Sequence, residues 1–392
     1  MNEFLLPTAV SEVLDRLEAA GHEAYLVGGC VRDFLRGVPP HDFDITTSAH
    51  PEETLAVFSD CRTIETGVRH GTVTVLSGGM PLEITTYRVD GDYTDHRRPD
   101  SIMFTPSLTE DLARRDFTVN AMAYSPTRGL ADPYGGREDL AAHCLRAVGD
   151  ARKRFGEDAL RILRALRFAS TLGFLLEAET AAAARELAAT ILSVAAERIR
   201  EELSRLVVGP AAASVLSEYK GIIALLLPGA RLSTAFGALP ADPVFRFADL
   251  LLSLGESGAE TVLTGLRADN ATVRAVGSLI RLFFAPLSPK RADLCRLLRR
   301  EGRKPLEAAL ILRASHGIAD PLVREELSAL LREGAPYLLS HLAVSGKDLC
   351  EVGIPKGKGL GDLLEILYTR VIEQELPNEK EALLAFALRT YA

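Results

Sequence analysis

Two aspartates one residue apart, Asp42 and Asp44, are the side chains in this sequence best suited to chemistry. Acidic and apolar residues alternate from 41 to 46, so both carboxylates are expected to leave the same face of a strand. Adjacent carboxylates repel each other unless cations lie between them, and Mg²⁺ is commonly held by one or two carboxylates together with substrate phosphates. The spacing therefore predicts a magnesium site that faces a phosphorylated substrate.

A pair of glycines precedes these aspartates, within the segment LVGGCVRDFLRGVPPHDFDITT at residues 26–47. The apolar run 24–27 has the length of a strand, and residues 31–35 begin a helix. Between them, Gly28 and Gly29 let backbone N–H groups approach a ligand such as a phosphate. Either motif alone is also explained by a turn and a solvated acidic strand, but their order and spacing together favour a nucleotide site.

A second set of polar residues follows the apolar spacing of a helix predicted over EDALRILRALRF, residues 157–168. One acidic and three basic residues recur at every third position: Asp158, Arg161, Arg164 and Arg167. Neighbours at this spacing touch along a helix. A salt-bridged surface helix, with Glu157 and Arg161 as an i,i+4 pair, is the alternative to a binding surface.

The residues between these two regions add further candidates. A hairpin is predicted from the strand 72–76, the turn Gly78-Gly79 and the strand PLEITTYR, which carries Glu83. Glu83 is either a third carboxylate near the metal or a solvent-facing side chain. Residues 87–100, YRVDGDYTDHRRPD, are rich in charge and turn formers and predict a mobile loop. In the run RRDFTVNAMAY at 114–124, three polar residues interrupt an otherwise apolar pattern: Arg115, Asp116 and Asn120.

Taken together, the motifs resemble those of the class II tRNA nucleotidyltransferases, the CCA-adding enzymes of the polymerase-β-like nucleotidyltransferase superfamily. The matching segments, in family order, are GGCVRD with DFD, RRDFTVNAMAY, DPYGGREDL, FGEDALRILRALRF and ERIREEL. The C-terminal VSGKDLCEVGIPKGKGLGDLLEIL is similar to the tail of the compact bacterial type, which has no HD domain. The resemblance covers nearly the whole chain.

The resemblance implies a fold and a set of roles. The fold is α+β, with a mixed-sheet nucleotidyltransferase head at 1–140 followed by an all-α neck at 141–210, body at 211–335 and tail at 336–392. The site residues would form a catalytic group, a metal-binding pair and a nucleotide-binding group. The catalytic group is Asp42, Asp44 and Glu83, of which Asp42 and Asp44 bind Mg²⁺, and the nucleotide-binding group is Gly28, Gly29, Arg32, Arg115, Asp116, Asn120, Asp158, Arg161, Arg164 and Arg167.

The expected activity is template-independent addition of C, C and A to the 3′ end of tRNA from CTP and ATP, with release of pyrophosphate, by two-metal in-line attack of the RNA 3′-hydroxyl on the α-phosphate. Cytosine and adenine both present an amino donor beside a ring-nitrogen acceptor, which suits the acceptor Asp158 and the donor Arg161. Uracil and guanine reverse that pattern and leave polar groups unpaired. An A-adding-only enzyme, a bacterial poly(A) polymerase and a non-catalytic tRNA-binding protein are the alternatives.

Composition fits an enzyme of several modules. The chain of 392 residues is too long for one compact core, and its content of 47% hydrophobic and 25% charged residues is that of globular proteins. No secretory leader, membrane span or obligatory protein partner is indicated, so a cytoplasmic location is expected. The net charge of −8 argues against a wholly basic RNA-coating surface. Local basic segments are the candidates for RNA contact: residues 288–304, and Lys347, Lys356 and Lys358 among glycines.

Overall fold

The computed structural model describes residues 4–91 and 102–391. Contacts within the chain define two compact units, Met1–Pro228 and Gly229–Ala392. Each unit is described by itself. The first combines the predicted head with the helices that follow it, and the second is helical throughout. The finer division into neck, body and tail stays a prediction.

The described part of the first unit contains a seven-stranded mixed sheet. β2 and β5 run parallel, and the other neighbouring strands run antiparallel. In spatial order the strands are β3 (Arg62–Ile64), β4 (Thr72–Ser77), β5 (Met80–Thr86), β2 (Asp44–Thr47), β1 (Ala24–Val27), β8 (Ala123–Ser125) and β9 (Gly129–Ala131). The predicted hairpin is confirmed as β4 and β5, joined through Gly78 and Gly79 at φ +55° and +80°, where a side chain would be strained.

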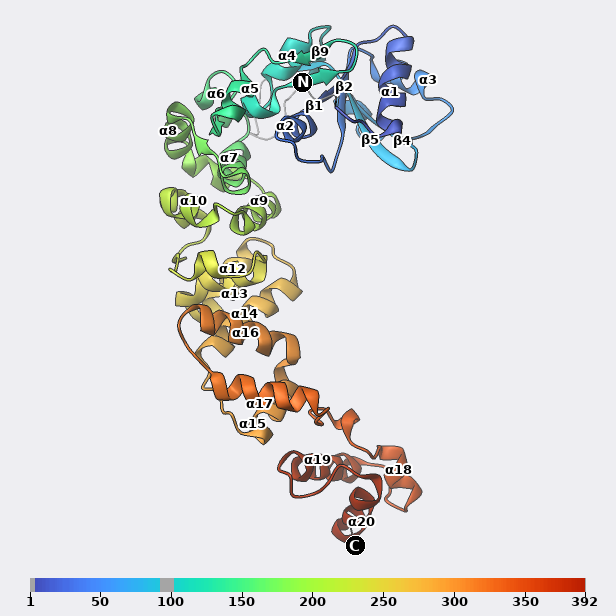
Figure 1. Ribbon diagram of the computed structural model, residues 1–392, viewed down its shortest axis with the longest axis vertical. Coiled ribbons are helices and arrows are strands. Elements are labelled where there is room, and N and C mark those ends of the chain that lie inside the picture. The colour runs from blue at the N-terminus through green and yellow to red at the C-terminus, as the bar shows by residue number, and fades with distance from the viewer. Residues whose placement is uncertain (1–3, 92–101, 392) are drawn as a thin grey trace. The chain divides into compact units, whose positions relative to one another are not determined.

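Two helices cover one face of this sheet, α1 (Thr8–Ala19) and α3 (Pro51–Val57), which contact β1, β4 and β5 (Figure 1). α1 is amphipathic and buries Val10, Val13, Leu14 and Leu17. Because strand residues alternate between faces, buried Ile45 and Ile84 belong to the covered face. Asp44 and Glu83 therefore lie on the opposite one.

Three short helices follow in the head: α2 (Gly29–Leu35), which contacts β1, α4 (Leu108–Ala113) and α5 (Gly136–Ala141). A separate antiparallel pair is formed by β6 (Arg88–Asp90) and β7 (Ile102–Phe104). β6 falls within the predicted loop 87–100, so the loop prediction is wrong for residues 88–90, which pair with β7. Residues 92–101, where most of that loop falls, lie outside the described residues. Its predicted mobility is therefore not addressed by the structure.

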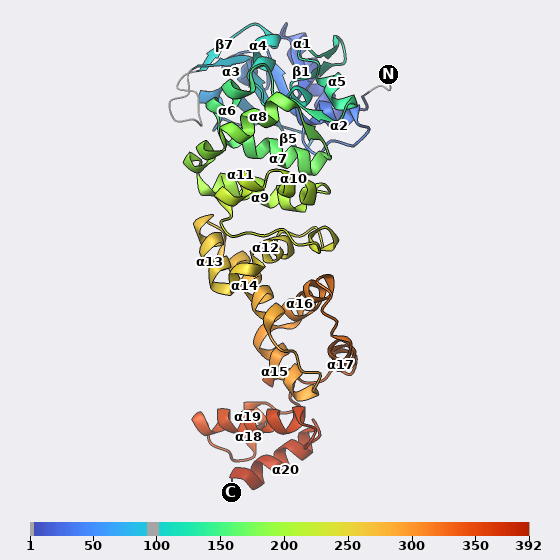
Figure 2. The same cartoon turned by 90° about the vertical axis from the view of Figure 1, so that its left-hand side faces the viewer.

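Helices make up nearly all of the remainder of the first unit. They are α6 (Ala151–Glu157), α7 (Leu160–Leu172), α8 (Ala178–Glu186), α9 (Ala196–Val208), α10 (Ala212–Glu218) and α11 (Lys220–Leu226). Short β10 (Cys144–Leu145) and β11 (Leu175–Leu176) pair in parallel beside them. α7 packs against α9 and α10 (Figure 2) and buries Ile162, Leu163 and Leu166.

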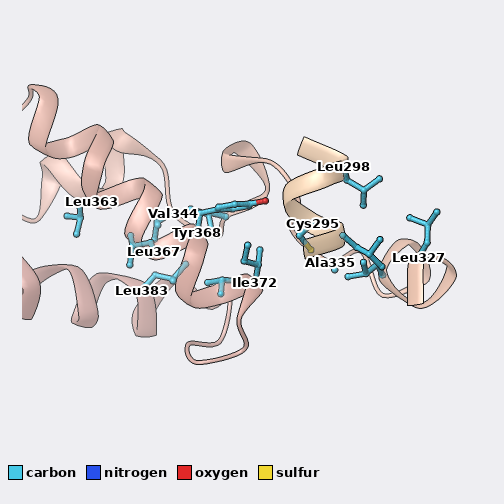
Figure 3. Packing of buried hydrophobic residues seen from close by; sticks show 14 of the residues in the cluster. Cys295, Leu298, Leu327, Ala335, Val344, Leu363, Leu367, Tyr368, Ile372 and Leu383 are labelled. Atoms are coloured by element: carbon cyan, nitrogen blue, oxygen red, sulfur yellow. The ribbon is translucent and has the colours of Figure 1, made fainter. Parts of the chain in front are cut away.

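The second unit consists of helices around its own apolar core. They are α12 (Pro243–Leu251), α13 (Gly255–Gly265), α14 (Asn270–Phe284), α15 (Arg291–Glu301), α16 (Arg303–Ser315), α17 (Pro321–Arg332), α18 (Gly346–Glu351), α19 (Lys358–Ile372) and α20 (Lys380–Tyr391). Figure 3 shows side chains of one buried cluster, including Leu298 of α15, Leu327 of α17, Leu367 of α19 and Leu383 of α20. Burial of these faces joins the last helices into one packed body.

The predicted α+β class is confirmed: a mixed-sheet head precedes helices that continue to the C-terminus. None of the helices among the described residues is long and apolar enough to cross a membrane.

Candidate nucleotide site

The turn between β1 and α2 brings backbone close to a cationic side chain. Gly28 has φ +78° and ψ −128°, and its N–H donates to the carbonyl of Met122 at 3.2 Å. A Cβ at Gly28 would lie 3.2 Å from Nη1 of Arg115. Only glycine combines this positive φ with that close approach. The turn and the Arg115 guanidinium therefore form one polar corner at the start of α2.

The three predicted acids meet beside this corner. Asp44 is directly opposite Glu83 in the parallel pairing of β2 and β5. Asp42 lies two residues earlier, and the intervening Phe43 is buried. The predicted strand began at 41, but the observed β2 begins only at Asp44, so Asp42 is in the extended segment that leads into it.

Electrostatics of the acids reflect this crowding. Loss of hydration raises the pKa of Asp44, and the nearby charges of Glu83 and Asp42 raise it further, against the opposing effect of Arg115. A cation placed among these carboxylates would relieve their repulsion. The arrangement thus has the chemistry of a divalent-metal site.

The geometry of the acidic side chains limits the kind of metal site that they can form. Among the described residues no group of three or more His, Cys, Asp or Glu side chains is close enough to enclose an ion alone. Mg²⁺ and similar hard cations keep several waters and are usually held by one or two carboxylates plus substrate phosphates. Asp42 and Asp44 fit this incomplete type of site, with Glu83 beside them.

A buried hydrogen-bond chain connects α2 to α7 through the 3₁₀ turn Thr118–Asn120. Arg32 donates from Nη1 to Oδ1 of Asn120 at 2.7 Å, and Asn120 donates from Nδ2 to Oδ1 of Asp116 at 3.2 Å. Arg164 of α7 donates from Nε to Oδ2 of Asp116 at 2.8 Å. The structure therefore brings together four predicted residues from separate motifs.

The charge of Asp116 is strongly stabilised within this chain. Burial alone would raise its pKa, but the charge of Arg164 and the hydrogen bonds from Arg164 and Asn120 outweigh it and lower the pKa to about 2, from 3.8. Because the folded pKa is below the unfolded one, the contribution to stability is complete above about pH 4 and is lost as the pH falls through 2.

This pKa shift gives a measurable expectation. Asp116→Asn should lower the free energy of unfolding by about 2 kcal/mol at pH 7. The difference from the wild type should shrink below pH 4, where Asp116 begins to be protonated in the unfolded chain. Urea unfolding of both proteins, followed by circular dichroism from pH 7 to pH 3, measures it. A deficit that does not change with pH would contradict the ion-pair explanation.

The helix predicted over 157–168 is in fact interrupted. α6 ends at Glu157, Asp158 is extended at φ −138° and ψ 104°, and α7 begins at Leu160. Asp158 therefore lies at the junction of two helices, where its Oδ1 accepts from the backbone N–H of Leu160 at 3.0 Å. The local reason is capping, since a short acidic side chain satisfies N–H groups at a helix start. Of the four polar residues predicted at every third helical position, only Arg161, Arg164 and Arg167 therefore lie on α7.

Asp158 and Arg161 each have partners in the fold. Asp158 accepts from Nη2 of Arg198 at 3.0 Å. Arg161 donates to Glu157 at 2.6 Å, as the i,i+4 spacing predicted, and to the carbonyls of Arg154 and Arg114. These contacts hold both side chains in place at the junction between α6 and α7.

The two remaining arginines share one buried acid. Nε of Arg167 lies 2.6 Å from Oε2 of Glu202, and Nη1 of Arg164 lies 4.0 Å from Oε1 of the same residue. Arg167 also lies over the ring of Phe168, 3.9 Å from its centroid. Arg164 thus bridges Asp116 of the head and Glu202 of α9, so it links the sheet-bearing part to the helices.

Sequence reasoning missed three buried or half-buried partners: Asp111, Arg198 and Glu202. Arg198 and Glu202 lie one turn apart on α9 within ERIREEL, and this i,i+4 spacing could have indicated that both face the same side of the helix. Asp111 offered the i,i+3 spacing to Arg114. None of these spacings reveals which distant side chain is contacted.

The basic segment 288–304 is less cationic in the fold than in the sequence. Arg299 forms a two-point ion pair with Glu365 at 2.6 and 2.7 Å, and Arg291 lies near Glu326 and Glu333. Acids brought in by α17 and α19 thus offset much of the charge. The solvated, salt-bridged helix face is the better interpretation of this segment.

Comparison with known proteins places the first unit in a recognised class. Residues 24–146 match the family described as the poly A polymerase head domain, and residues 173–230 match the probable RNA and SrmB-binding site of polymerase A. Residues 246–387 match a putative tRNA nucleotidyltransferase domain 2. The sheet-bearing part is therefore a nucleotidyltransferase head.

Relatives that match over nearly the whole chain identify the family more closely. The CCA-adding enzyme of Limosilactobacillus fermentum is 37% identical, with 96% of this chain and 95% of that protein covered. The enzyme of Geobacillus stearothermophilus is 36% identical over the same shares. The chain belongs to the family of CCA-adding enzymes, as the sequence motifs predicted.

Solved structures agree with this assignment. The crystal structure of the Bacillus stearothermophilus CCA-adding enzyme in complex with CTP matches with a TM-score of 0.81 at 32% identity, covering 98% of each chain. The Thermotoga maritima CCA-adding enzyme complexed with tRNA shares the fold at a TM-score of 0.69 and 19% identity, covering all of this chain and 97% of that one. Both the sheet and the helical parts thus follow the architecture of the family.

Proposed function

We propose that this enzyme adds C, C and A in turn to the 3′ end of tRNA, using CTP and ATP and releasing pyrophosphate. The observation that carries the proposal is the meeting of Asp44 and Glu83 across parallel strands, with Asp42 beside them and the Gly28 corner adjacent. Full-length similarity to CCA-adding enzymes supports the same activity.

Divalent metal is expected at the acids, and we propose Mg²⁺ held by Asp42 and Asp44. When bound, it would supply positive charge against the triphosphate and the attacking 3′-hydroxyl during in-line displacement. Glu83 adds negative charge next to Asp44 and so favours cation binding. The protein side chains fix where the two substrates meet.

The triphosphate would be held at the β1–α2 turn. Gly28 and Gly29 expose backbone N–H groups at the start of α2, and Arg115 places its guanidinium against Gly28. The chain from Arg32 through Asn120 to Asp116 stands next to this corner. A mixed set of donors and acceptors can contact a ribose 2′-hydroxyl, which is itself both donor and acceptor.

Base choice is assigned to Asp158 and Arg161, with Arg164 and Arg167 supporting them. A carboxylate has about four acceptor positions, and Asp158 has two described contacts. An arginine has five N–H donors, and Arg161 has three described contacts. Both side chains thus retain capacity to read the amino group and ring nitrogen shared by cytosine and adenine.

One incorporation experiment separates this activity from the alternatives. The substrates are tRNA ending at its discriminator base, tRNA ending in CC, and an unrelated RNA, each with CTP, ATP and Mg²⁺. We expect C, C and A on the first, A on the second and little on the third. Long A tracts on unrelated RNA would instead indicate poly(A) polymerase, and A addition to CC ends alone would indicate the A-adding-only enzyme. Action in the cytoplasm stays a prediction.

RNA binding by the second unit gives a further expected outcome. Lys356 and Lys358 are exposed at the start of α19. We expect Lys356→Glu with Lys358→Glu to raise the KM for tRNA by about tenfold, because charge reversal removes phosphate contacts, while the KM for CTP stays unchanged. The control is Arg299→Gln, whose charge is already paired with Glu365. Equal effects from the control would argue against this contact.

A further inference from the structure

Asp111, the third residue from the end of α4, is a fully buried carboxylate in a place that sequence motifs did not indicate. Its exposed fraction is 0%. A buried charge is costly unless it is paired and hydrogen-bonded. Its partners therefore show what this carboxylate is positioned to hold.

The partners of Asp111 come from three separate elements. Thr46 of β2 donates its hydroxyl at 3.1 Å, and the backbone N–H of Arg88, where β6 begins, donates at 3.3 Å. Arg114 donates from Nε at 2.9 Å, and its Nη2 lies 2.8 Å away. One side chain thus connects the end of α4 to the strand that carries Asp44 and to the start of β6.

A fourth contact reaches the nucleotide site itself. Nη2 of Arg115 lies 3.6 Å from Oδ2 of Asp111, while Nη1 of the same guanidinium lies against Gly28. The charge of Arg115 also acts on Asp44. The guanidinium is therefore held between Asp111 on one side and the β1–α2 turn on the other. Moving Asp111 would move the charge of Arg115 relative to the metal-binding acids.

We propose that Asp111 is a positioning residue for nucleotide addition. It acts through Arg115: it holds the guanidinium at the polar corner beside Gly28, at a fixed position relative to the strand that carries Asp44. The inference rests on the proposed function. It differs from a purely structural role, in which Asp111 would anchor α4 without affecting the substrate.

The test is a double-mutant cycle with Asp111→Asn, Arg115→Ala and the double variant, measured as kcat and KM for CTP on tRNA lacking its CCA end. Asparagine keeps the size of the side chain and removes the charge. If Asp111 acts through Arg115, Asp111→Asn should reduce kcat/KM by about tenfold or more in the wild type. In the Arg115→Ala background the same change should have little further effect, because the group that it positions is gone.

Stability must be separated from positioning. Thr46→Val serves as the matched control, since it removes the hydroxyl bond to Asp111 and leaves the carboxylate beside Arg115. It should lower the melting temperature with a smaller effect on kcat/KM. If Asp111→Asn does not fold, the charge-balanced pair Asp111→Asn with Arg114→Gln replaces it in the cycle.

Two results would overturn the inference. The first is an active wild type in which the double variant loses as much kcat/KM as the two single variants combined. Asp111 would then not act through Arg115. The other is an Asp111→Asn variant that is less stable yet retains full kcat/KM. A wild type that adds no nucleotide to tRNA would instead contradict the proposed function, so the two failures are distinguishable.

Discussion

Asp42→Ala should abolish incorporation of both C and A, with a loss of at least about a thousandfold in rate, because several kcal/mol of charge stabilisation depend on the metal-binding pair. In this variant, a loss of activity can be distinguished from a loss of folding. Asp42 is exposed and precedes β2, so its removal should leave the fold intact. We expect equal losses with both nucleotides, because the proposed role of the acids concerns the reacting phosphate and not the base.

The measurement combines primer extension with an assay that does not depend on activity. Binding of Mn²⁺ in the presence of a non-hydrolysable CTP analogue, followed by electron paramagnetic resonance, should weaken in Asp42→Ala. Glu52→Ala, an exposed acid on α3 across the sheet, is the matched control and should behave as wild type. Extension within tenfold of wild type by Asp42→Ala would refute the catalytic assignment.

Asp158→Ala should relax base choice more than it lowers the rate with CTP. In the proposed base-reading scheme, uracil is rejected through two reversed contacts, each costing roughly 1–3 kcal/mol when left unpaired. Removing the carboxylate eliminates one of them and lets the site relax around the other. We expect discrimination between CTP and UTP to fall by about a hundredfold, which corresponds to about 3 kcal/mol.

A stability effect accompanies this change, because Asp158 also caps α7 and pairs with Arg198. The loss of a cap typically costs about 1 kcal/mol. Arg198→Gln provides the comparison: it breaks the same ion pair and keeps the carboxylate. This control should lose stability and keep its discrimination. Competition between CTP and UTP in single-turnover extension measures the discrimination of both variants. If Asp158→Ala keeps the selectivity of the wild type, the base is read by other residues.

Local features of the head were accessible from sequence because they depend on short-range chemistry. The apolar run before Gly28 predicted β1, and the glycines at 78 and 79 predicted the hairpin that places Glu83 on β5. Alternation predicted the shared face of Asp42 and Asp44, although β2 begins later than the pattern indicated. Turn conformation and side-chain alternation are properties of adjacent residues, so the sequence contains them directly.

Pairings across long distances in the chain were not accessible in this way. Apolar periodicity predicted one continuous helix at 157–168, yet Asp158 leaves helical geometry where it caps α7 and pairs with Arg198. The basic segment 288–304 likewise loses much of its charge to acids such as Glu365, which only the packing of α19 against α15 brings near. Burial and ion pairing depend on which elements pack against each other. The spacing of residues along one helix does not specify those distant partners.

The sequence by itself determined the residue types of the site, the turns that present them and the family to which they belong. The tertiary structure decided the register that sets Asp44 opposite Glu83, the partner that fixes Arg115 and the acids that surround each arginine of α7. The physical reason is that short-range preferences fix local conformation, whereas the free energy of a charge depends on its surroundings, which exist only after distant segments have packed.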